Sequence, residues 1–367
     1  MLNFHRKLTL ILFLGMLIPF AHESMGQQYS NNRFGATLGY GFMIAHRANM
    51  RHLIQGHTTS LELQYTIKPK PGHLATYYNN PSIGIQLGYY NPGNQEQIGT
   101  CMGVFPSLRF QLWNRKYAPF FQFGAGMGWV EKPFDQLTNY QNIAIGSHIN
   151  SIVQFRIENN FQWDRASVKV GIGFTHFSNA AFSAPNLGIN LPTLYTGLAF
   201  GKIRSQYDLD ETEKSEEPSR NQRHELFYGM GAREISLHNP KKYLTGSLNY
   251  QYFRQFSNVF AWTAGTDLFF NPSLGAELNS SKLLDKANFQ WGVCIGTELL
   301  FNSSSIYLQQ GLYVLSPFKG NGSAYNRLGY RRRFQNGWII NFGLKTHLAV
   351  AEYFEIGIGY SFKQKIE

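Results

Sequence analysis

The sequence has little charge, few cysteines and no long apolar run after residue 21. Only 15% of its 367 residues are charged, and the mean hydropathy is −0.28. Without a later apolar stretch of about 18 residues, a helical membrane protein is excluded. Cys101 and Cys294 lack metal-ligand spacing, so no metal site is expected. The sequence permits a disulfide between them but does not require one.

Aromatic residues and glycine are abundant instead. Aromatics make up 16% of the chain, and there are 36 glycines. Aromatic side chains favour strands, and glycine suits crowded barrel walls. A membrane barrel keeps a low mean hydropathy, because half of each strand faces a polar interior. The composition therefore favours an all-β protein.

The first residues have the pattern of a secretory signal peptide. Basic residues at 5–7 precede an apolar run at 8–21, and small residues stand at Ser24 and Gly26. We expect residues 1–26 to be removed on export. A transmembrane anchor is the alternative, which the short core interrupted by Pro19 disfavours.

Beyond residue 27 the chain alternates with a period of two, as strands do. Leu61, Leu63 and Tyr65 oppose Glu62 and Gln64, for example. The predicted strands of the first half span 34–47, 58–68, 82–90, 98–113, 117–130, 149–163, 167–178 and 193–203. Those of the second half span 225–236, 243–254, 259–270, 289–301, 306–315, 325–334, 338–348 and 353–362, where 325–334 is a weaker candidate.

We predict an antiparallel outer-membrane β-barrel, against a soluble β-sandwich as the alternative. We interpret an acidic segment at 208–222 as a linker between domains at 27–207 and 223–367. Four short matches suggest that the second half is a degenerate tandem repeat of the first. They pair 60–65 with 247–252, 89–92 with 269–272, 101–103 with 294–296, and 171–174 with 357–360. One larger barrel of about 16 strands remains the alternative.

The segment 168–178 carries the strongest chemical signal. Its apolar face ends in His176 and Ser178, two residues apart on the same side of a strand. These side chains can act as general base and nucleophile. Taken alone, such a pair is usually an interfacial polar pair at a barrel rim. The last match of the repeat puts Phe362 and Gln364 at the corresponding positions, so chemistry is expected in the first half only.

The run His176-Phe-Ser178-Asn179-Ala180, followed by Pro185-Asn186-Leu-Gly188-Ile-Asn190, resembles the PagL-type lipid A 3-O-deacylases. These are eight-stranded outer-membrane esterases with a His-x-Ser-Asn motif, an Asn-x-Gly stretch and then a Glu. The resemblance is specific over 168–190 and architectural over 27–207. It implies an enzyme that needs no cofactor, with lipid A, the lipid anchor of lipopolysaccharide, as substrate.

The resemblance also implies a role for each motif residue. Ser178 would be the nucleophile, His176 the general base and Asn190 the group that orients His176. Asn179, with Asn186 and Gly188, would support the oxyanion and the loop. The family has a Glu where this chain has Asn190, which carries no charge to stabilise the imidazolium. We therefore expect a slower enzyme, another acid such as Glu158 or Asp164, or lost activity.

The resulting hypothesis is a lipid A deacylase in the bacterial outer membrane, with a non-catalytic structural, lipid-binding or pore-forming barrel as the alternative. The chain is basic, with a formal net charge of +11, which suits an anionic lipid surface. Export excludes nucleic acid as a partner, and the oligomeric state stays open. Basic side chains cluster as a candidate phosphate site, or a solvated turn, at Arg327, Arg331, Arg332 and Arg333.

Overall fold

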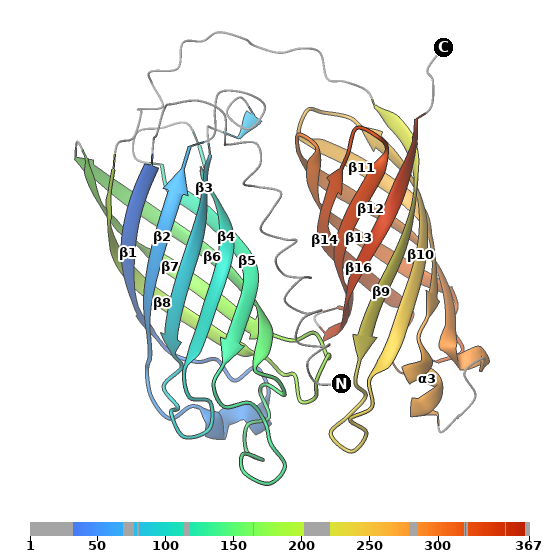
Figure 1. The fold of residues 1–367 in the computed structure, drawn as a ribbon, viewed down its shortest axis with the longest axis horizontal. Helices are drawn as coiled ribbons and strands as arrows, with labels where there is room; N and C mark the ends of the chain where they lie inside the picture. The colour runs from blue at the N-terminus through green and yellow to red at the C-terminus, as the bar shows by residue number, and fades with distance from the viewer. Residues whose placement is uncertain are drawn as a thin grey trace. The chain divides into compact units, whose positions relative to one another are not determined.

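The computed structural model describes residues 32–68, 77–78, 81–113, 118–163, 165–201, 221–278, 285–318, 320, 322–348 and 350–363. Within these ranges the chain forms two closed antiparallel barrels of eight strands each (Figure 1). The prediction of two eight-stranded units is confirmed, and the single larger barrel is excluded. No helix in the described ranges is long and apolar enough to cross a membrane.

The first barrel runs in chain order and closes by pairing of its first and last strands. Its strands are β1 (Asn32–Gly41), β2 (Thr58–Ile67), β3 (Ser82–Asn91), β4 (Cys101–Gln111), β5 (Phe120–Val130), β6 (Ile149–Trp163), β7 (Ala166–Ser178) and β8 (Ile189–Phe200). All eight predicted strands are present. The last of them begins at Ile189, ahead of the predicted residue 193, so Asn190 lies in a strand and not in the preceding loop.

The two faces of the first barrel have opposite chemistry. Along β2, Glu62 and Gln64 are buried inside, whereas Leu61 and Leu63 are 44% and 52% exposed on the outside. This reverses the pattern of a soluble protein and matches a wall that faces lipid. Charged side chains pair within this interior, where Arg156 meets Glu62 at 2.5 Å.

The loops after β1, β3, β5 and β7 gather at one end of this barrel (Figure 1). A short 3₁₀ helix, η1 (Ala48–Leu53), lies in the first of these loops. Its buried Met50 and Leu53 belong to one apolar cluster with Ile98, Ile145 and others. The cluster fixes the loops around the end of β7, where the candidate site lies.

The second barrel repeats this plan and closes through β9 and β16. Its strands are β9 (Gln222–Arg233), β10 (Tyr243–Gln255), β11 (Phe260–Phe270), β12 (Phe289–Phe301), β13 (Ser304–Leu315), β14 (Ala324–Arg333), β15 (Trp338–His347) and β16 (Val350–Lys363). Two short helices, α3 (Pro272–Glu277) and η3 (Lys286–Asn288), follow β11. The weaker strand candidate at 325–334 is confirmed as β14.

Three of the four sequence matches join strands with the same position in their barrels, namely β2 with β10, β3 with β11 and β4 with β12. The fourth match is wrong, because it joins β7 to β16, the last strand of the second barrel. The strand that corresponds to β7 is β15, which ends at His347. Short Gly-x-Gly runs recur in many barrel strands, which explains the false match.

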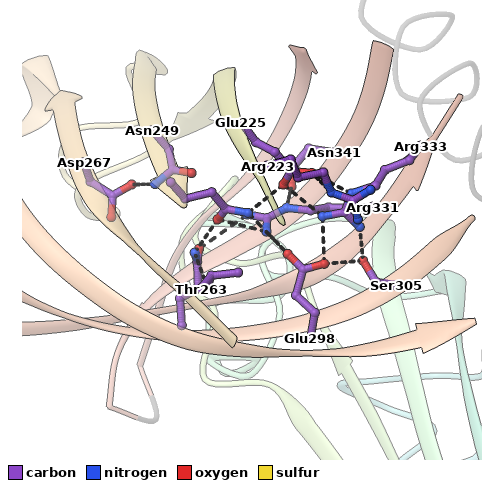
Figure 2. Close-up of polar contacts among 12 residues, drawn as sticks. Arg223, Glu225, Asn249, Thr263, Asp267, Glu298, Ser305, Arg331, Arg333 and Asn341 are labelled. Atoms are coloured by element: carbon purple, nitrogen blue, oxygen red, sulfur yellow. Dashed lines mark hydrogen bonds and ion pairs between the residues drawn. The ribbon is translucent and has the colours of Figure 1, made fainter. Parts of the chain in front are cut away.

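The arginine cluster of β14 is not a surface patch, and Figure 2 shows two of its members, Arg331 and Arg333, in contact with other polar side chains. Arg327 and Arg331 are almost fully buried inside the barrel, and Arg333 also points inward. Arg331 pairs with Glu298, and Arg333 pairs with Glu225 and Glu298 at 2.8 Å.

Four residues earlier on the same face of β14, Arg327 pairs with Asp267 at 2.5 Å and with Glu355. Arg332 alternates to the other side of β14, where it donates to Ser304 Oγ at 3.0 Å. The prediction that this cluster binds phosphate is therefore corrected. Three of its four guanidinium groups neutralise carboxylates within the barrel.

Some predictions fall outside the described residues. They concern the signal peptide at 1–26 and most of the acidic linker, at 208–220. Both cysteines are free and buried, Cys101 in the first barrel and Cys294 in the second.

We expect Arg327→Met to lower the free energy of unfolding of the second barrel by about 3 to 5 kcal/mol, because it leaves buried carboxylates without their partner. Arg332→Met, on the same strand, should cost about 1 kcal/mol or less. Urea titration of both variants in lipid vesicles measures the difference. Equal losses would show that the buried ion pairs do not stabilise the barrel.

Candidate functional site

The end of β7 holds His176 and Ser178 on the outward-facing side of the first barrel. The strand pairs with β8 so that His176 lies directly opposite Asn190. The imidazole Nδ1 of His176 is 2.7 Å from Oδ1 of Asn190. A carbonyl oxygen accepts and does not donate, so Nδ1 carries the proton and Nε2 is the basic nitrogen.

Ser178 is 9% exposed, and His176 is half-buried. The backbone of Ser178 is held by Ser151, whose hydroxyl donates to the Ser178 carbonyl at 2.8 Å. In the described part of the chain, neither the Ser178 hydroxyl nor His176 Nε2 has a hydrogen-bond partner. Both groups are thus free to engage a substrate, and catalytic hydrogen bonds are often absent or long before substrate binds.

Asn190 contacts a second histidine that the sequence analysis missed. Its Nδ2 lies 3.1 Å from Nδ1 of His46, in the loop after β1. The backbone continues the pairing of β1 with β8, because Ile44 N–H donates to the Asn190 carbonyl at 2.9 Å. The alternation of Phe42, Ile44 and His46 on the outward side was the signal available in the sequence.

Gly188 lies against the His176 ring. Its φ is +83°, a left-handed conformation that glycine adopts easily. A Cβ at this position would lie 2.7 Å from Cε1 of His176, closer than atoms can approach. Its N–H donates to the Ala144 carbonyl at 2.9 Å, which anchors the close approach.

The loop after Ser178 is held by amide side chains. Asn186 Oδ1 accepts from the backbone N–H of Asn179 at 2.9 Å, and Asn179 Nδ2 donates to Ser147 Oγ at 2.8 Å. The Asn179 backbone N–H is therefore already engaged here. The next two residues, Ala180 and Ala181, have φ values of 49° and 59°, a conformation that costs energy for residues other than glycine.

Of the two alternative acids, only Glu158 lies within the described residues, and it has no role at this site. Glu158 lies inside the barrel, where it pairs with Arg109 at 2.5 Å and accepts from the Tyr195 hydroxyl at 2.7 Å. His176 faces outward, so Glu158 does not orient it. Asp164 lies outside the described residues. No group of three or more potential metal ligands occurs in the residues that the structure describes.

The second barrel has different chemistry at the corresponding strand end. His347, at the end of β15, has Nε2 at 2.9 Å from the Tyr313 hydroxyl and Nδ1 at 3.6 Å from Glu352. Glu352 is buried, and it also pairs with Lys345 at 2.9 Å. These residues form part of an interior polar network and do not reproduce the outward-facing pair. Phe362, the predicted counterpart of His176, lies opposite His224, and Gln364 lies outside the described residues.

Comparisons with known proteins match both halves of the chain. The model of the lipid A 3-O-deacylase family, PagL, matches residues 59–199. The model of the acyloxyacyl hydrolase C-terminal domain, PagL_C, matches residues 222–364. No curated protein matches the chain.

Among solved structures, a triple mutant of the Rhodopseudomonas blastica porin is 8% identical, with 91% of this chain and 100% of that chain covered and a TM-score of 0.18. Another mutant of the same porin is 9% identical, with the same coverage and TM-score. Scores this low carry no argument about fold or function. The two family models together cover most of the chain, one on each barrel, and on this ground the chain belongs to the PagL family of lipid A 3-O-deacylases.

Proposed function

We propose that the protein is a serine esterase that hydrolyses an ester-linked acyl chain of lipid A. The family and the barrel fold point to the bacterial outer membrane as its location. The observation that carries the proposal is the 2.7 Å contact between His176 Nδ1 and Asn190 Oδ1, two residues from Ser178 on the outward face. This contact leaves the basic Nε2 of His176 available to the serine.

The reaction proceeds by acyl transfer. The Ser178 hydroxyl attacks the ester carbonyl while His176 Nε2 takes its proton, which gives a tetrahedral oxyanion. His176 then returns that proton to the departing sugar oxygen, and an acyl-serine forms. Water, deprotonated by the same imidazole, then attacks the acyl-serine carbonyl, and His176 returns this proton to Ser178 Oγ as the fatty acid leaves.

The outer wall next to His176 supports a lipid substrate. Ile172 and Val170, on the same face of β7, are 56% and 48% exposed, and Leu194 on β8 is 68% exposed. An acyl chain that lies along this wall brings its ester to the end of β7. The substrate then arrives sideways from the leaflet, and the barrel interior takes no part in binding.

Asn190 makes this esterase a slow one. An amide orients the imidazole through its oxygen but offers no negative charge to stabilise the imidazolium of the transition state. The same neutrality favours the second candidate, a non-catalytic barrel that binds lipid. Mass spectrometry of the lipid separates the two.

Cells that express the chain should yield lipid A that lacks one acyl chain, whereas Ser178→Ala should leave lipid A intact, because the variant has no nucleophile. Mass spectrometry of extracted lipid A measures this, and the mass lost identifies the chain. Ser82→Ala, at the other end of the barrel, is the matched control and should behave as the wild type. If lipid A stays intact with a correctly folded wild type, the esterase proposal fails.

Gly188→Ala should lower the rate of lipid A deacylation at least about tenfold, because the new methyl group displaces the His176 ring. Gly322→Ala is a matched control with a left-handed φ of +80° but nothing within 4 Å of its Cβ. Both variants carry the same backbone strain, so only the first should lose activity. Equal rates in single-turnover assays would argue against a role for the His176 position.

Asn190→Asp should raise kcat about tenfold or more at unchanged KM, since the isosteric carboxylate adds charge at the 2.7 Å contact with His176. Steady-state kinetics on lipid A in mixed micelles measure it. A decrease in kcat would mean that the amide is an adaptation of this site and not a defect.

A further inference from the structure

Asn190 lies between two imidazole rings on the outer face of the first barrel. Its Oδ1 is 2.7 Å from Nδ1 of His176, and its Nδ2 is 3.1 Å from Nδ1 of His46. An amide has one accepting end and one donating end. The side chain therefore has two orientations, which exchange the roles of the two histidines.

The two orientations differ in the state of His176. With Oδ1 toward His176, the proton is on Nδ1 and Nε2 keeps its lone pair. With Nδ2 toward His176, Nδ1 must accept, so the proton moves to Nε2 and no base faces Ser178. A carboxylate at this position accepts through both oxygens and has no such choice. With Asn190 in place of the family's Glu, the amide must therefore be held in one of its two orientations for His176 to act as a base.

His46 occupies the place that can meet this requirement. The chain beyond β1 stays paired with β8 through Phe42 N–H to Pro192 O at 3.3 Å and Ile44 N–H to Asn190 O at 2.9 Å. The strand alternation then carries His46 to the same side as the Asn190 side chain. His46, Asn190 and His176 form a row across three neighbouring chain segments on the outward face.

The geometry points to His46 as a positioning residue. Its Nδ1 lone pair accepts a hydrogen bond from Asn190 Nδ2, which keeps Asn190 Oδ1 on His176 and leaves His176 Nε2 as the base. The catalytic consequence rests on the proposed esterase function, whereas the orientation of the amide does not. His46 acts through Asn190 and is not itself a catalytic residue.

The orientation can be measured without activity. The full chain with ¹⁵N-labelled histidine, folded in detergent micelles, gives the protonation of each ring nitrogen by NMR, and His176→Gln identifies the signals of His176. We expect a protonated Nδ1 and a bare Nε2 in the wild type. In His46→Ala a second population with the proton on Nε2 should appear. His57→Ala, another exposed histidine of the same loop, should leave the His176 signals unchanged.

Kinetics then test whether the orientation matters to the reaction. His46→Ala should lower kcat on lipid A about tenfold with little change in KM. In an Asn190→Asp background the same substitution should change kcat less than about twofold, because a carboxylate needs no orienting partner. A purely structural role for His46 would persist in both backgrounds.

Each outcome decides the inference. Identical His176 signals in the wild type and His46→Ala, or an undiminished loss of kcat in the Asn190→Asp background, overturn it. If the wild type does not cleave lipid A but its His176 signals respond to His46→Ala as expected, the positioning role stands and the esterase proposal fails instead.

Discussion

The structure depends on one constraint, which is that backbone N–H and C=O groups within a lipid bilayer must find their partners inside the protein. Closed barrels meet it, because every strand pairs on both sides. Closure also fixes the register of the strands, and the register determines which side chains meet at the candidate site. His176 lies opposite Asn190 only because β7 and β8 pair along their whole length, and His46 reaches the same row because the pairing of β1 with β8 extends past the strand end.

Much of this fold could be predicted from the sequence, because strand alternation is a local property. A period of two in residues such as Leu61, Glu62 and Leu63 marks both the strand and its faces. The His-x-Ser spacing likewise put His176 and Ser178 on one side of β7. The part of the candidate site that a single strand contributes could therefore be predicted from the sequence.

The rest depended on contacts between segments far apart in the chain. His46 and Asn190 are separated by 144 positions, so nothing local joined them. Asn190 lay outside the predicted strand, which was placed at 193–203, whereas β8 begins at Ile189. Arg327, Arg331 and Arg333 read as a surface patch, because charge density suggests exposure. Their spacing of four and two residues put them on one face of a strand, but only the carboxylates on other strands identify that face as the interior.

Because His176 faces outward, the relevant substrate concentration at this site is the concentration within the membrane leaflet. A substrate and a fatty-acid product that both remain in the leaflet never pass through bulk water. The site then responds to the mole fraction of lipid in a two-dimensional film, and dilution of the surrounding solution changes nothing. In the proposed reaction, encounters depend on lateral diffusion, and the product leaves by mixing with its neighbours in the leaflet.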